Sequence, residues 1–276
     1  MECRINVREL APGVFCLTDR MGMHMTLLCG AAQALLIDTG YGFDDLNAAV
    51  RQITSLPLRV INTHGHHDHA CGNDLFSQVE LAAAELPICA DYVASQRERV
   101  WRQARERGVD LADWHQEDYL CRGCGTLRAL TCDRMDLGGL TAHFLESPGH
   151  TPGSLAVYVP ERRLLMTGDD WNPTTWLFFP EAEGIACLRR SILRLLALDF
   201  DWVLPAHDAR LWPRHVLQTF YDATSPEQLR AHAVPASGMY PGKRVMLIHP
   251  QPGHSLYYDA DKAEPEPPDM SAPKAP

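Results

Sequence analysis

Short apolar runs separated by turn residues dominate the first part of the chain. Residues 14–18, 26–29 and 34–38 predict strands, and the last two predict a hairpin. Because these runs are almost continuously apolar, we expect strands that are covered on both faces. Apolar residues then recur at helical spacing over residues 43–53, and a β-branched run at 59–62 predicts the next strand.

The pattern continues with alternating helices and strands. Residues 83–107 predict a helix whose many Arg and Glu residues are typical of a solvated face, whereas residues 108–132 are irregular. Further strands are expected at 140–145, 154–159, 163–166 and 202–204, a helix at 188–198, then helices at 211–223 and 226–233 and a strand pair at 245–248 and 255–258. Strands alternating with helices predict an α/β layered domain.

The same pattern predicts how the chain is divided. We expect a single domain over residues 1–258, with a helical insertion around 84–132 and a helix and strand extension at 209–258. The irregular part of the insertion is long enough to cover a site as a lid. Pro, Ala, Glu and Lys dominate residues 259–276, which predicts a disordered tail.

Composition narrows the classes of partner. The chain has 276 residues, is 46% hydrophobic and carries a formal net charge of -10, which disfavours nucleic acids and anionic membranes. The N-terminus lacks an apolar signal segment, and no run reaches the roughly 18 apolar residues of a membrane span. Nine scattered cysteines favour a reduced, cytoplasmic setting. A small-molecule substrate is the expected partner, and a homo-oligomer is left open.

The candidate chemistry is concentrated directly after the strand at 59–62. His64, His66, Asp68 and His69 fall within six positions, and Gly65 is expected to allow a sharp bend in a loop that carries them. Imidazole and carboxylate groups suit zinc, iron and manganese. This density of ligand types predicts a metal site.

The pattern His-x-His-x-Asp-His resembles the signature of the metallo-β-lactamase superfamily. Four further segments resemble that superfamily's other motifs and follow its order, at residues 35–40, 147–154, 164–169 and 203–208. The resemblance covers residues 14–207. It implies a four-layer αβ/βα sandwich, in which two sheets pack together and helices cover both outer faces.

The resemblance also implies a ligand set for two divalent metal ions. The first ion would be held by His64, His66 and His150, the second by Asp68, His69 and His207, and Asp169 would bridge them. Zinc is the default, with iron or manganese as alternatives. A metal-bridging hydroxide would be the nucleophile, and Asp68 or Asp169 would carry the proton to the leaving group.

Residues outside this set have two interpretations each. Asp38 either orients a ligand imidazole or only ends a strand, and His24 either lines the pocket or lies at the surface. Trp171 and Trp176 follow the bridging carboxylate and would form an apolar pocket wall or part of the core. His67 is expected to point away from the metals.

The resemblance is closest in motif type to hydroxyacylglutathione hydrolases and lactonases, which carry an Asp bridge. It therefore implies hydrolysis of an ester, thioester or lactone. A β-lactam hydrolase or phosphodiesterase would use the same ligands, and an iron-dependent oxidoreductase is a third class, although such enzymes usually have Glu where this chain has His66. The roles of the insertion and of Cys121 and Cys124 stay open.

Overall fold

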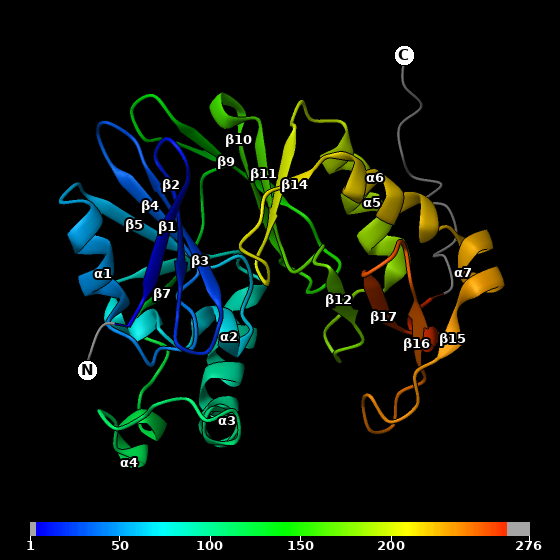
Figure 1. The fold of residues 1–276 in the computed structure, drawn as a ribbon, viewed down its shortest axis with the longest axis horizontal. Coiled ribbons are helices and arrows are strands. Elements are labelled where there is room, and N and C mark those ends of the chain that lie inside the picture. Colours follow the sequence, from blue (N-terminus) through cyan, green and yellow to red (C-terminus); the bar gives the residue numbers. More distant parts are fainter. Residues whose placement is uncertain (1–3, 264–276) are drawn as a thin grey trace.

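The structure, a computed structural model, describes residues 4–263 (Figure 1). Most of the expected disordered tail, residues 264–276, lies outside the described residues. Its first residues, 259–263, are ordered, because they end the last strand and form a short 3₁₀ turn, η3 (Ala260–Lys262). Across the described chain, no helix is long and apolar enough to cross a membrane.

Within these residues, seven strands form the first sheet in chain order. They are β1 (Asn6–Ala11), β2 (Val14–Thr18), β3 (His24–Cys29), β4 (Ala34–Ile37), β5 (Leu58–Ile61), β6 (Val79–Leu81) and β7 (Leu127–Ala129). The expected hairpin is confirmed, since β3 and β4 pair antiparallel, and the pairs from β4 to β7 are parallel. The parallel part aligns the carboxyl ends of β4 and β5 at one edge, where the metal-ligand motif follows.

The second sheet has the order β14-β13-β11-β10-β9-β8. Its strands are β8 (Arg134–Asp136), β9 (Thr141–Glu146), β10 (Leu155–Val159), β11 (Leu164–Gly168), β13 (Trp202–Pro205) and β14 (Trp212–Pro213). The strands β11 and β13 are parallel neighbours, so their carboxyl ends deliver the segments at 169 and 207 side by side.

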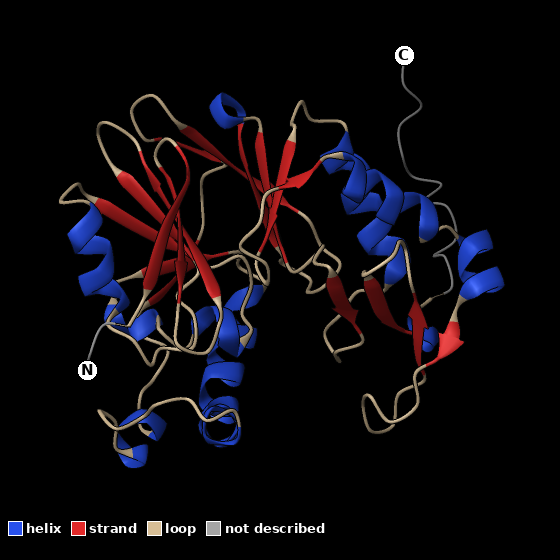
Figure 2. Ribbon diagram, viewed as in Figure 1, coloured by secondary structure: helices blue, strands red, loops and turns tan. Residues whose placement is uncertain are grey.

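The two sheets pack face to face, with helices outside them (Figure 2). Leu35 and Ile37 face the second sheet, whereas Ala34 and Leu36 on the same strand face the outer helices, which confirms the prediction of a strand covered on both sides. The helices are α1 (Leu46–Ile53), α2 (His67–Ala70), α3 (Glu85–Glu106), α4 (Gln116–Leu120), α5 (Ile185–Leu196), α6 (His215–Ala223) and α7 (Pro226–His232), with 3₁₀ turns η1 (Asn73–Leu75) and η2 (Pro160–Arg162). The four-layer arrangement is therefore the one expected.

A third sheet with the order β12-β17-β16-β15 lies beside the second one. It comprises β12 (Thr174–Leu177), β15 (Val234–Pro235), β16 (Val245–Ile248) and β17 (Ser255–Asp259). The predicted pair at 245–248 and 255–258 is confirmed, but the pattern missed β12, which pairs parallel with β17. The C-terminal segment is thereby joined to the chain directly after Asp169.

The segment at 108–132 is more regular than its sequence indicates. It contains α4 and ends in β7, which pairs with β6 at the edge of the first sheet. Tyr119 is fully buried, stacks on Phe43 with 4.2 Å between ring centroids, and donates its hydroxyl to the Tyr41 carbonyl at 2.9 Å. These contacts make the segment part of the core cluster that also contains Leu46 of α1 and Trp101 of α3.

We expect Tyr119→Ala to lower the free energy of unfolding by about 3–5 kcal/mol, because it leaves a large cavity beside Phe43. Tyr119→Phe removes only the hydrogen bond and should cost about 1 kcal/mol. Urea titration followed by circular dichroism measures both changes, with Gln116→Ala on the exposed side of α4 as the control. Equal, small effects of all three variants would show that the segment is not part of the core.

Candidate metal centre

The histidine-rich motif begins where β5 ends, but it is not a simple loop. The chain bends at His64, His66 is extended, and His67–Ala70 forms one turn of helix, α2, which carries Asp68 and His69. The backbone bends at Thr63 and His64, directly before Gly65, and Gly65 itself does not adopt a positive φ. A side chain at Gly65 would place its Cβ 2.5 Å from the Cys89 backbone nitrogen of α3. Glycine is needed because a helix packs directly on the motif.

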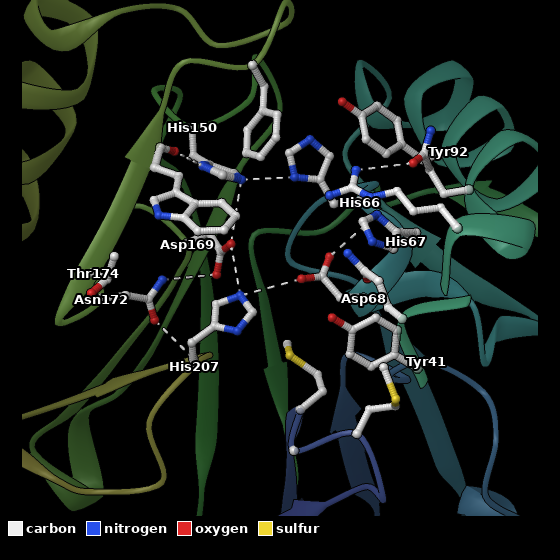
Figure 3. A pocket seen from close by; sticks show the side chains of 18 of the residues that line it. Tyr41, His66, His67, Asp68, Tyr92, His150, Asp169, Asn172, Thr174 and His207 are labelled. Carbon is white, nitrogen blue, oxygen red and sulfur yellow. Dashed lines mark hydrogen bonds and ion pairs between the residues drawn. The ribbon is translucent and has the colours of Figure 1, made fainter. Parts of the chain in front are cut away.

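The remaining candidate ligands come from the second sheet. His150 lies in the loop between β9 and β10, Asp169 directly follows β11, and His207 follows β13. Figure 3 shows Asp169 and His207 on one side of the cavity, facing Asp68 and His66 on the other. The site is thus assembled where the two sheets meet.

All seven candidate ligands come together. Their ligand atoms form three overlapping groups, each within 4.8 Å: His64, His66 and His150; His64, His69 and Asp169; Asp68, His69 and His207. The first and third groups are the two sets implied by the sequence resemblance.

Asp169 lies between those two sets. Its Oδ2 is 3.6 Å from His150 Nε2 and 3.2 Å from His207 Nε2, and its Oδ1 is 3.5 Å from His69 Nε2 (Figure 3). Asn172 donates its side-chain amide to Asp169 Oδ1 at 3.1 Å. One carboxylate therefore faces ligand atoms from both sets, which is the geometry of a bridge.

The donor set fits divalent metal ions. The Nε2 atoms of His64 and His69 are buried and have no hydrogen-bond partner among the described residues. Such atoms normally find partners. Both point into a cluster of nitrogen and oxygen donors that suits zinc, iron or manganese.

The electrostatics of the cluster favour the ligand forms of several groups. Burial and neighbouring imidazoles hold the pKa of His64 well below its usual range. Burial alone would raise the pKa of Asp68, but the fields of His67, His69 and His207 outweigh it and keep that pKa low. Burial lowers the pKa of His69, yet Asp38 and Asp169 raise it overall, so binding of a cation there would release a proton.

Asp38 orients one of the ligands. Its Oδ2 accepts a hydrogen bond from His69 Nδ1 at 2.8 Å, and its Oδ1 accepts one from the Thr63 backbone N–H at 2.7 Å. The Asp38 backbone has a φ of 65°, which is uncommon for any residue other than glycine. This geometry favours the orienting interpretation over an ordinary strand-end turn.

Two buried carboxylates that sequence reasoning missed hold the ligand loops. Glu85 accepts the backbone N–H groups of Gly65 at 2.8 Å and Gly153 at 2.7 Å. Asp170 accepts the Ser147 hydroxyl and the His150 backbone N–H, and burial raises its pKa to about 7. Glu85 is one of many charged residues in the predicted helix, and Asp170 follows the motif residue Asp169. No sequence feature therefore distinguished either of them from its neighbours.

Glu181 is a third residue that the sequence pattern missed. It contacts the candidate ligand His66, from which it is 115 residues away in the sequence. Its Oε1 accepts a hydrogen bond from His66 Nε2 and another from the Tyr92 hydroxyl. His66 thereby turns its Nδ1 towards His150 Nε2, 2.9 Å away. Burial would raise the pKa of Glu181, but His66 and Tyr92 lower it to about 2.

The ligands open into a cavity of about 370 Å³. Trp176 lines it as one interpretation had it, but Trp171 is fully buried against Trp212, and His24 is not part of the lining. His67, expected to point away from the metals, lines the same cavity and belongs to none of the ligand groups. None of residues 108–132, the irregular part expected as a lid, lines this cavity, whereas α3 at the start of the insertion does.

The cysteine pair takes no part in this centre. Cys121 and Cys124 are free thiols, and neither belongs to a cluster of candidate metal ligands within residues 4–263. The role of the two cysteines, left open by the sequence, is therefore not metal binding within this centre.

We expect Asp38→Asn to weaken metal binding by about 10–100-fold, because His69 loses the charged partner that fixes its ring. Competitive titration against a chromophoric chelator measures the change. Asp133→Asn, at an exposed position before β8, is the matched control. Unchanged affinity in the Asp38 variant would contradict the orienting role.

Glu181→Ala should also weaken metal binding, and Glu181→Gln should do so less, because an amide oxygen can still accept from His66. Tyr92→Phe is expected to have the smallest effect, since Glu181 keeps His66. Glu183→Gln, exposed two residues away, controls for the local charge change. The same chelator titration measures the metal affinity of each variant. Equal affinities for the Glu181 and Glu183 variants would show that the contact between Glu181 and His66 does not contribute to metal binding.

Known proteins resemble this chain over the same regions. A family model described as the metallo-β-lactamase superfamily matches residues 21–115. The acyl-coenzyme A thioesterase MBLAC2 of Bos taurus is 24% identical over 222 residues, which cover 72% of this chain and 80% of the relative. A linear primary-alkylsulfatase from Pseudomonas sp. (strain ATCC 19151) is 28% identical over 162 residues, covering 49% of this chain and 31% of that protein.

Comparison with solved structures points to the same fold. The sec-alkylsulfatase Pisa1 from Pseudomonas sp. superimposes with a TM-score of 0.61 at 17% identity, covering 82% of this chain. This chain spans only 43% of that protein, so the likeness concerns the fold. Motif order, four-layer architecture and the family match over residues 21–115 all resemble the metallo-β-lactamase superfamily, and the chain has the fold of that superfamily's solved structures.

Proposed function

We propose that the chain is a dinuclear metallo-hydrolase that cleaves a thioester or a related ester or lactone. The observation that carries the proposal is the position of the Asp169 carboxylate, which faces His150 in one ligand set and His69 and His207 in the other. A single-metal site would not need a carboxylate that faces both sets.

The two sets define which residues would hold the metals. His64, His66 and His150 would bind one ion, and Asp68, His69 and His207 the other, with Asp169 shared. When bound, divalent metals would lower the pKa of water towards neutrality and polarise the substrate's carbonyl oxygen. Zinc is the proposed metal because the set is built from imidazole and carboxylate donors, which also suit iron and manganese.

Proton transfer is assigned to Asp68. Asp169 is engaged by Asn172 on one oxygen and by His207 on the other. Asp68 Oδ1 lies 3.9 Å from His67 Nδ1, a nitrogen without a hydrogen-bond partner among the described residues. Asp68 can therefore accept the proton of the attacking water and return it to the leaving group, beside a His67 that burial keeps neutral by lowering its pKa to about 4.

The walls of the cavity support an acyl substrate. Trp176 and Phe179 form an aromatic surface, and Phe179 packs edge-on against His66, with 5.1 Å between ring centroids. An apolar acyl chain would lie on this surface with its carbonyl at the ligand cluster. The thioesterase relative, matched over most of its own length, favours thioesters within this class.

Other chemistries use the same ligands and are outcomes of the test. Hydrolysis of an alkyl sulfate is a second candidate, because an alkylsulfatase matches about half of this chain. β-Lactams and phosphodiesters remain alternatives on the same site. The proposal also includes a small-molecule substrate, no nucleic-acid or membrane partner, and a cytoplasmic location. The net charge of -10 and the free cysteines support these parts. The oligomeric state is left open.

The test measures metal content and turnover together. Protein purified without added metal should contain about two equivalents of zinc and hydrolyse thioesters, and chelation should abolish turnover until metal is restored. Asp169→Ala should retain about one equivalent and lose at least about a hundredfold in kcat, because the bridge is missing. Elemental analysis and a panel of thioester, lactone, β-lactam, phosphodiester and alkyl sulfate substrates provide the readings.

Asp118→Ala, at an exposed position on α4, is the control and should keep both metals and full activity. A folded, fully loaded protein that cleaves only alkyl sulfates would replace the proposed substrate class. Stoichiometric iron with a visible absorption band and no hydrolysis would replace the reaction type.

A further inference from the structure

One face of α3 forms a polar wall along the cavity. Tyr92, Gln96, Arg99, Gln103 and Arg107 all line it. Their spacing of four, three, four and four residues places them on a single helical stripe. We call these five residues the α3 stripe.

The stripe starts at the metal centre and leads away from it. Tyr92 packs on His66, with 4.5 Å between ring centroids. With a rise of about 1.5 Å per residue, Arg99 lies about 10 Å and Arg107 about 22 Å further along the helix axis. A group bound to the arginines would therefore be remote from the scissile bond.

The charges on this wall are of one sign. Among the described residues, the only carboxylates that line the cavity are Asp68 and Asp169, both candidate metal ligands. Neither Arg99 nor Arg107 is ion-paired within residues 4–263; Arg99 has only a 3.4 Å hydrogen bond to Gln96. By contrast, Arg97 on the buried side of α3 donates to the carbonyls of Cys71 and Gly123. In a chain of net charge -10, two exposed cations without an ion pair on the wall of this cavity favour an anionic ligand.

The opposite wall is aromatic and uncharged. Trp176, Phe179 and Tyr240 line it, with centroid distances of 6.2 Å between Trp176 and Phe179 and 6.4 Å between Phe179 and Tyr240. A substrate that satisfies both walls has an apolar part on one side of its reactive carbonyl and an extended anionic part on the other.

We propose that the α3 stripe binds the leaving group of the substrate, and that this leaving group is an elongated thiol whose far end carries phosphate groups recognised by Arg99 and Arg107. The inference rests on the proposed function, since it assigns the thiol side of a thioester to this wall. Guanidinium groups match phosphate oxygens in bidentate geometry. Gln96 lies between Tyr92 and Arg99, and Gln103 lies between the two arginines, so both supply amides for a neutral, polar linker.

The experiment compares two thioesters with the same acyl group. Octanoyl-coenzyme A carries phosphates on its thiol, whereas S-octanoyl-N-acetylcysteamine has a short neutral thiol. The double variant Arg99→Gln/Arg107→Gln should lower the ratio of kcat/KM for the first substrate over the second by at least about tenfold, mainly through KM. The matched control Arg102→Gln/Arg105→Gln removes the same charge from exposed positions of α3 and should leave this ratio within about twofold.

A binding measurement separates this inference from the proposed reaction. Desulfo-coenzyme A, which has no thiol and no scissile bond, is titrated calorimetrically into the metal-loaded proteins. The wild type should bind it, and the Arg99/Arg107 variant should bind at least about tenfold more weakly, with the difference shrinking as salt is raised.

Equal effects of the two double variants, an unchanged ratio, or no binding of desulfo-coenzyme A to the wild type would each overturn the inference. Hydrolysis of the neutral thioester would still support the proposed function in those cases. Conversely, arginine-dependent binding without any thioester cleavage would support the anion-binding wall and reject the thioesterase. An S-acyl glutathione cleaved in preference to the coenzyme A thioester, with the same dependence on Arg99 and Arg107, would replace phosphate by carboxylate recognition.

Discussion

Hydrogen bonds from backbone N–H groups to buried carboxylates are the interactions on which the metal centre depends. Asp38 binds the start of the histidine motif, Glu85 joins that motif to the loop after β9, and Asp170 holds the backbone of His150. Each bond is shielded from water, where hydrogen bonds are stronger, so each helps to fix a loop that has little regular structure. Without them, ligands from two sheets would not converge within the few ångströms that a metal ion requires.

Because the ligands come from two sheets, the two halves of the chain contribute different parts of the site. The first half supplies the histidine motif and the polar wall of α3, and the second supplies Asp169, His207 and the aromatic wall that begins at β12. The contact between Glu181 and His66 crosses from one half to the other at the ligand cluster. Chemistry and substrate recognition therefore both depend on the packing of the two sheets through apolar side chains such as Leu35, Ile37 and Phe144.

The fold and the ligands could be predicted because their signals are local. The apolar run at β4 indicates a doubly covered strand, and the spacing of the histidines indicates ligands within a few residues of one another. What the pattern missed depends on distant partners. Gly65 is required by α3 packing against it, β12 forms by pairing with β17 some 80 residues later, and Glu181 lies 115 residues from His66. No periodicity or spacing within a short window carries that information.

The most direct test of the account is a crystal structure of the metal-loaded protein with anomalous diffraction measured at the zinc edge. Two anomalous peaks about 3.5–4 Å apart are expected, with Asp169 between them, His64, His66 and His150 at one, and Asp68, His69 and His207 at the other. A single peak, or peaks away from these seven residues, would contradict the dinuclear centre and the hydrolytic mechanism built on it.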